Sequence, residues 1–330
     1  MSRRALFFLL LVLVVGAALV SLGAGAPVSL LDLGSADEGK RNAAHAIFFS
    51  LRPTRALAAL LVGASLSVAG AGLQTLFRNP LAEPYLLGVS SGGALGAAIA
   101  TALRLPLLLG FDAAVPLAWV GAVGAGFLVF ALGRGNTSGF DNGSGRARLL
   151  LVGVALSSFG SALLSLVVAL SGRLELAQEI SFWLLGGMAR ATLTQDGILA
   201  ASLVGGFLVL RSNTRDLDAL NAGDEDALAL GVNYHALQTK VLLGAGLLVA
   251  SSVAVAGIIG FVGLLAPHMV RLGGGRDAKT LLPGAALAGA ALLCGCDAMA
   301  RSAFAPVEVP VGVFTALLGV PLFLALARKM

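Results

Sequence analysis

One segment of this sequence has the pattern of a phosphate-binding loop. Gly34–Arg41 fits G-x-x-x-x-G-K, in which backbone N–H groups cradle the phosphates of a nucleotide. Arg41 stands where a Ser or Thr would bind Mg²⁺, and Asp37 and Glu38 would repel phosphate. We therefore reject the segment as a nucleotide site.

The histidines and cysteines are the remaining residues that could bind a metal or act in catalysis. His45, His235 and His268 fall on different predicted loops, and no Cys/His spacing suits zinc. Cys294 and Cys296 point about 200° apart around a helix, so they are predicted to be buried thiols that do not bridge each other. No nucleophile–base set is apparent. The sequence thus predicts no catalytic residues, no metal site and no cofactor, and a function other than that of an enzyme.

Composition identifies the environment of the chain. Of its 330 residues, 58% are hydrophobic and 12% are charged, against about 25% charged in a soluble domain. A bilayer removes the need for a polar shell, and the 44 glycines suit close packing of membrane helices. The basic residues are scattered rather than clustered with aromatics, which argues against nucleic acid as a partner. We predict an all-α polytopic membrane protein.

Nine apolar stretches are candidate membrane spans, and the first, although it resembles a signal peptide, is expected to be retained. Val241–Val270 has 30 residues where a span needs about 20, and it contains glycines and Pro267, so two crossings are predicted within it. Ten spans with both termini cytoplasmic put most of the 22 Lys and Arg residues inside, as the positive-inside rule favours. The stretches are Ala5–Ala26, Ala56–Phe77, Leu86–Leu103, Ala113–Gly133, Leu149–Gly172, Ala191–Leu210, Val241–Val270, Thr280–Cys296 and Val309–Ala327.

The longest predicted cytoplasmic loop, Arg211–Lys240, contains a short helix. Asp224, Glu225 and Asp226 are acids that would complement the dipole at a helix N-terminus, and Gly231 is a stop signal. A face of Ala and Leu follows the acids. From the residues alone, this helix either packs on its own protein or receives a partner.

Three long motifs resemble the FecCD-type permeases, the membrane subunits of ABC importers for ferric siderophores, heme and vitamin B12. They are RNPLAEPYLLGVSSG at 78–92, GFVGLLAPHMVR at 260–271 and EVPVGVFTALLGVP at 308–321, and they occur in the family's order. The resemblance runs from about Arg52 to Ala327 and implies one permease domain, residues 1–330, in a bacterial inner membrane.

The family resemblance also implies partners. These are a second copy of the chain, a separate ATP-binding cassette ATPase and a periplasmic binding protein. Residues 217–238 match the family's ATPase-coupling region, and Arg52, Arg55 and Arg301 match its arginines that dock the binding protein's glutamates. The coupling residues are then predicted to be Leu220, Asp224, Glu225, Asp226, Ala227, Leu230, Gly231 and Val232.

The substrate is predicted from the segment after the fifth span, which in this family borders the translocation path. Phe182 and Trp183 resemble the heme permeases, and Arg173 is the first candidate to pair with the propionates of heme. Alternatively, Arg173 anchors the interface or pairs with Glu175 or Glu179. The Arg134–Arg148 loop is longer and richer in Gly and Ser than in the family, so gate residues there are not carried over.

Other functions remain open at this point. The same machine could carry a ferric siderophore or vitamin B12. An ion-coupled secondary transporter would need charged relays in the middle of the membrane. Only Asp196 and Asp297 lie near span interiors, and both are near predicted ends.

Overall fold

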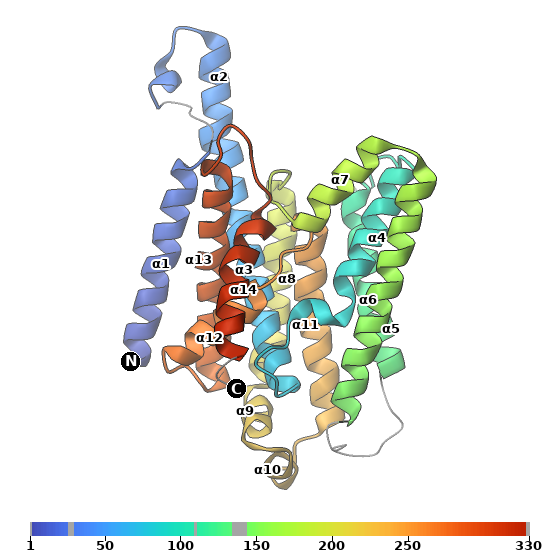
Figure 1. Ribbon diagram of the computed structural model, residues 1–330. Coiled ribbons are helices and arrows are strands. Elements are labelled where there is room, and N and C mark those ends of the chain that lie inside the picture. Colours follow the sequence, from blue (N-terminus) through green and yellow to red (C-terminus); the bar gives the residue numbers. More distant parts are fainter. Residues whose placement is uncertain (1, 26–29, 109–110, 134–143, 328–330) are drawn as a thin grey trace.

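The computed structural model describes residues 2–25, 30–108, 111–133 and 144–327, and their regular structure is almost entirely helical (Figure 1). The α-helices are α1 (Arg3–Gly23), α2 (Glu38–Ala46), α3 (Arg52–Leu76), α4 (Val89–Ala102), α5 (Ala114–Gly133), α6 (Ser144–Ser171), α7 (Leu174–Leu185), α8 (Leu193–Ser212), α9 (Thr214–Ala222), α10 (Asp224–Ala229), α11 (Tyr234–Ala256), α12 (Val262–Leu272), α13 (Ala278–Ser302) and α14 (Val311–Ala327).

The described helices match the apolar stretches of the sequence, which confirms the all-α membrane fold. Seven are long and apolar enough to cross a bilayer, with α2 and α3 forming one continuous run, Glu38–Leu76. The apolar helices α4, α12 and α14 are shorter. Because a straight crossing needs about 20 residues, the number of ten crossings stays a prediction.

The long apolar stretch Val241–Val270 is divided, as its length and glycines predicted. Helix α11 ends at Ala256, and α12 begins at Val262. Between them Gly257 has a φ of 68°, and Phe261, which precedes α12, also has a φ of 68°. Glycine adopts this left-handed backbone without strain, which explains the end of α11 at Gly257.

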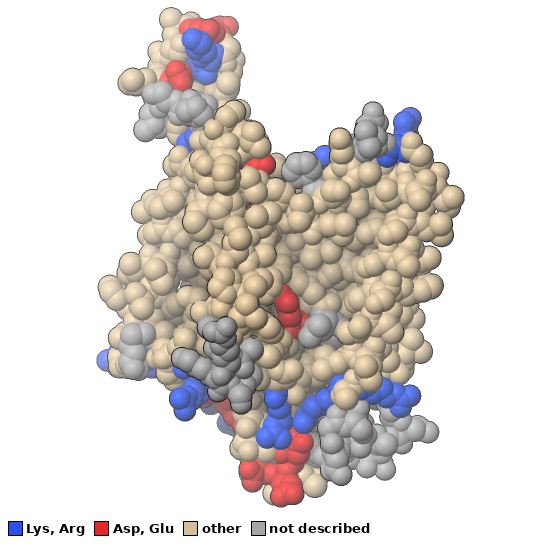
Figure 2. Space-filling view, viewed as in Figure 1, with Lys and Arg blue, Asp and Glu red and all other residues tan. Residues whose placement is uncertain are grey.

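The two ends of the molecule differ in the elements they expose. Helix α1 begins and α14 ends on the same side as α9 and α10, whereas α2 and α7 lie at the opposite end (Figure 1). We refer to these as the α10 end, which the sequence predicts to be cytoplasmic, and the α2 end. Lys, Arg, Asp and Glu gather at both ends, and the surface between them is mainly uncharged (Figure 2).

Glycines allow the central helices to touch backbone to backbone. A Cβ added to Gly70 of α3 would meet the carbonyl oxygen of Gly263 in α12, and one added to Gly63 would meet that of Gly289 in α13. Helix α3 is therefore buried among its neighbours and packs along α13, α11 and α12. Such close approach is how membrane helices gain packing energy where lipid gives little hydrophobic drive.

Candidate functional site

The predicted coupling region, residues 217–238, comprises most of α9, all of α10 and the first turn of α11, with a break between α9 and α10 at Gly223. The acids Asp224, Glu225 and Asp226 form the first turn of α10, and Gly231 follows the helix with a φ of 76°. The helix and its stop are thus where the sequence placed them. Leu220, Ala227 and Val232 are buried, whereas Glu225, Asp226 and Leu230 are exposed.

Asp224 differs from the other two acids because its carboxylate is held by arginines. Nη1 and Nη2 of Arg146, in the first turn of α6, donate to it at 3.1 and 2.6 Å. Nη1 of Arg78, just after α3, lies 3.5 Å from the same carboxylate. The hydrogen bonds from Arg146 hold the pKa of Asp224 below its usual value. Residues 134–143 of the predicted gate loop lie outside the described part of the chain.

At the α2 end, Asp297 brings two of the three predicted docking arginines together. Its carboxylate is fully buried and lies 3.0 Å from Nη2 of Arg55 and 3.0 Å from Nε of Arg301. Arg55 also donates to Glu308 at 2.8 Å. The cluster links α3, α13 and the segment before α14.

The last turn of α1 is held by Arg301 and Arg52. Arg301 donates to the carbonyl oxygens of Ser21 and Ala24, and Arg52 donates to that of Leu22. Helix C-termini carry unpaired carbonyl groups, which cationic donors stabilise. Both arginines are buried, so in this structure their guanidinium groups serve contacts within the chain.

A cavity of about 880 Å³ lies beside the Asp297 cluster. It opens to solvent and is lined by residues of α3 and of the ends of α5, α7, α8, α11 and α14, with both apolar and polar groups in its lining. Trp183 and Arg190 line it, as do Arg55 and Glu308 of the cluster. A large concave site with a few charged groups is the usual form of a ligand site.

Of the predicted substrate-path residues, Trp183 lines this cavity and Arg173 does not. Nη2 of Arg173 donates to the carbonyl oxygens of Thr101 and Ala102 at 3.1 and 2.7 Å, at the C-terminus of α4. The side chains of Phe182, Glu175 and Glu179 lie outside the described part of the structure. The cavity arginine Arg190 flanks the same segment in the sequence as Arg173, but only Arg173 was predicted as a path residue.

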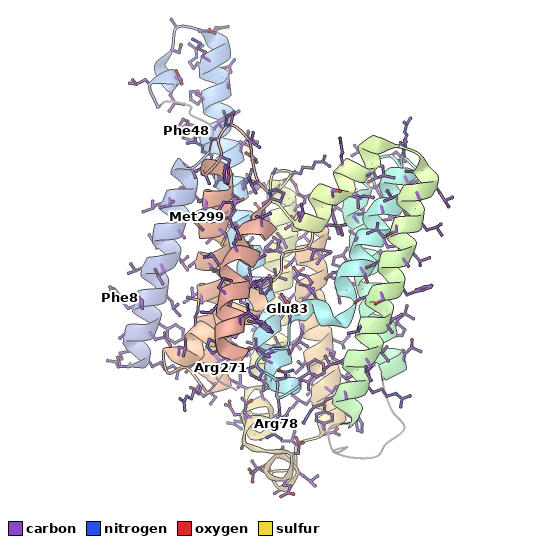
Figure 3. All side chains as sticks on the ribbon, viewed as in Figure 1. Phe8, Phe48, Arg78, Glu83, Arg271 and Met299 are labelled. Atoms are coloured by element: carbon purple, nitrogen blue, oxygen red, sulfur yellow. The ribbon has the colours of Figure 1, made fainter. Side chains whose placement is uncertain are left out.

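A further polar cluster supports the break between α11 and α12. Oε1 of Glu83 accepts a hydrogen bond from the Phe261 N–H at 2.5 Å, and the Tyr85 hydroxyl accepts one from the Ile259 N–H at 2.7 Å. Figure 3 labels Glu83 between the two ends of the molecule, and Figure 2 shows acidic atoms on the same face. Within the described residues, no group of three or more His, Cys, Asp or Glu side chains could hold a metal ion.

Comparison with known proteins points to one family. The model of the FecCD transport family matches residues 5–329. The hemin transport system permease protein HmuU of Yersinia pestis is 39% identical over 289 residues, which are 86% of this chain and 83% of HmuU. The vitamin B12 import system permease protein BtuC of Serratia proteamaculans is 42% identical over 294 residues, 87% of this chain and 83% of BtuC.

A solved structure has the same fold over its whole length. It is an ABC transporter of the metal-chelate type in an inward-facing conformation. It matches with a TM-score of 0.83 and 33% identity, covering 100% of both chains.

Proposed function

This chain belongs to the FecCD transport family, as a permease subunit of an ABC importer of the metal-chelate, vitamin B12 and hemin type, and we propose that its own substrate is heme. It is a multi-pass protein of a bacterial cytoplasmic membrane. In this family the permease is not the catalytic subunit, and we propose that a separate ATPase supplies the energy.

The observation that supports heme is the lining of the 880 Å³ cavity. Heme is a flat, largely apolar ring with two carboxylates. Trp183 offers an aromatic face to such a ring, and the guanidinium of Arg190 can pair with a carboxylate. A hemin permease is among the relatives of this chain, at 39% identity, which is consistent with heme as substrate.

Vitamin B12 is the second candidate, because a vitamin B12 permease is 42% identical to this chain. A ferric siderophore is a third candidate that would use the same machine. The polar groups of the cavity lining, including Gln178, Thr192 and Gln195, suit a substrate rich in amides as well as one with carboxylates.

The partners follow from the family. We propose that an ATPase subunit binds the exposed face of α10 at Glu225, Asp226 and Leu230, and that a binding protein docks at the α2 end. Arg55 is the one of the three predicted docking arginines that lines the cavity, whereas Arg52 and Arg301 donate to carbonyl groups at the end of α1. A second copy of the chain completes the permease, a proposal that rests on the family resemblance.

Uptake into proteoliposomes tests the substrate. The permease would be reconstituted with its cognate ATPase and with binding protein loaded with hemin, cyanocobalamin or a ferric siderophore. We expect ATP-dependent uptake of hemin and not of the other two. Uptake of cyanocobalamin or siderophore alone would overturn heme while leaving the importer function in place.

A further inference from the structure

The carboxylate of Asp224 joins three segments that are distant in the sequence. Arg146 binds it with two guanidinium nitrogens from the start of α6, and Arg78 reaches it from the residue pair after α3. Such a two-point contact fixes orientation as well as distance. The side chains of Asp224 and Arg146 are 28% and 13% exposed, so the pair is largely shielded from water.

Several other side chains in α10 and just after it are exposed. Glu225 and Asp226 are exposed, and so are Leu228 and Leu230, with 63% and 72% of their surface accessible. We call these exposed side chains, in α10 and at Leu230 after it, the outer face of α10. Asp224 and the buried Ala227 instead contact the rest of the protein. The two groups suit different roles, because a partner can cover the first without displacing the second.

Other contacts connect the same region to the membrane helices. Arg146 lies over the ring of Tyr234, the first residue of α11, at 5.4 Å from its centroid. On α9, Oδ1 of Asp218 accepts from the Ala278 N–H at 2.6 Å, at the start of α13. Lys240 of α11 donates to Asn213 before α9 at 3.1 Å. The pair α9–α10 is thus tied to several helices, and Arg146 is its contact with α6.

We propose that Asp224 is a positioning residue that transmits displacement of α10 to α6 and α3, rather than a contact for the ATPase. The proposal rests on the importer function given above. When the ATPase moves the outer face of α10, the Arg146–Asp224 pair must either carry the start of α6 with it or break. A two-point ion pair that is partly shielded from water resists separation, so movement of α6 is the preferred response.

The test separates recruitment of the ATPase from its coupling to transport. Asp224→Asn, Arg146→Gln and the double variant would be purified as full-length permease and reconstituted with ATPase and binding protein. Three quantities would be measured: ATPase subunit bound, ATP hydrolysed, and hemin or cyanocobalamin taken up per ATP, using the substrate that the unaltered complex carries. Two further variants serve as controls. Asp224→Glu keeps the carboxylate, and Arg276→Gln removes an exposed arginine from a different turn of the chain.

We expect both single variants to bind the ATPase normally and to lower uptake per ATP about tenfold. The double variant should be no worse than either single one, because the two residues act as a pair. Asp224→Glu should retain coupling, and Arg276→Gln should match the unaltered protein. Glu225→Gln, on the outer face, should instead weaken ATPase binding. If Asp224→Asn fails to fold, Arg146→Gln tests the same pair.

Two results would overturn the proposal that the Asp224–Arg146 pair transmits displacement of α10. One is loss of ATPase binding in Asp224→Asn but not in Arg146→Gln, which would make Asp224 a direct contact. The other is normal uptake per ATP in every variant. The unaltered permease serves as the control for the importer function. If it recruited no ATPase subunit, the importer function itself would be overturned, whereas a defect confined to the variants would concern only the Asp224–Arg146 pair.

Discussion

Glu83 and Phe261 are 178 residues apart in the sequence, yet the carboxylate of one accepts the backbone N–H of the other at 2.5 Å. Phe261 immediately precedes α12 and has the left-handed φ of 68°. Irregular backbone within a membrane protein persists where its polar groups are satisfied by the protein. Glu83, with Tyr85, provides this for the break between α11 and α12.

Replacing Glu83 by Ala should therefore destabilise the protein. The Phe261 N–H would lose its acceptor in a part-buried position, at a cost of about 1–3 kcal/mol. Thermal unfolding in detergent measures the change. The control is Glu38→Gln, at an exposed pair with Arg41, which should stay within about 0.5 kcal/mol. Equal effects of the two changes would contradict the role of Glu83.

Two glycine substitutions test the backbone contact between α3 and α12. Gly70→Ala places a Cβ against the Gly263 carbonyl, so the helices must separate, and we expect a loss of about 1–3 kcal/mol or more. Gly246→Ala, within α11, meets nothing within 4 Å and should be neutral or slightly stabilising. Unfolding temperatures of the two variants compare them directly. If Gly70→Ala left the stability unchanged, α3 and α12 would pack less closely at Gly70 than the structure shows.

Asp297→Asn should have one of the largest effects of any single change. It removes the fully buried negative charge between the part-buried side chain of Arg55 and the buried one of Arg301, and breaking such a pair costs about 3–5 kcal/mol. Glu308→Gln changes the other acidic partner of Arg55, which is half exposed, and should lower the free energy of unfolding by less than about 1 kcal/mol. Chemical denaturation of both variants gives the comparison, and the reverse order would show that Glu308 is the principal partner.

The pair formed by Asp224 and Arg146 should resist mild acid. The folded pKa of Asp224 is lowered, so its contribution to stability is present above the unfolded value of about 3.9 and is lost as pH falls through the folded pKa. The stability difference between the unaltered protein and Asp224→Asn should be constant from about pH 7 to pH 5 and shrink below about pH 4. A difference that vanished near pH 6 would argue against the pair.

Arg173→Ala and Arg190→Ala distinguish two roles for arginine near the cavity. Arg173→Ala leaves the last carbonyls of α4 without a charged donor, at a cost of about 1–2 kcal/mol. Arg190→Ala should lower hemin uptake, because Arg190 lines the cavity. Hemin uptake and thermal unfolding would be measured for both. Uptake lost in Arg173→Ala at unchanged stability would support the predicted propionate contact instead.

The sequence by itself determined the class of fold and the position of the long apolar helices, whereas α2 and α7 lie outside the apolar stretches that it identified. Few charges and long apolar stretches leave a chain no alternative to membrane helices, because lipid cannot satisfy an exposed backbone. Local signals were equally reliable: Gly257 ends α11, the three acids begin α10, and Gly231 follows it. Three long motifs were enough to indicate the family.

Only the tertiary structure decided which side chains meet. No spacing connects Arg146 with Asp224, or Glu83 with Phe261, because these contacts join segments brought together by helix packing. In the structure, Arg52 and Arg301 donate to carbonyl groups at the end of α1 and Arg173 to those at the end of α4, while their docking and substrate roles stay predictions. Helix formation depends on neighbouring residues, whereas an ion pair depends on the placement of whole helices, and the linear pattern of residue types does not contain that placement.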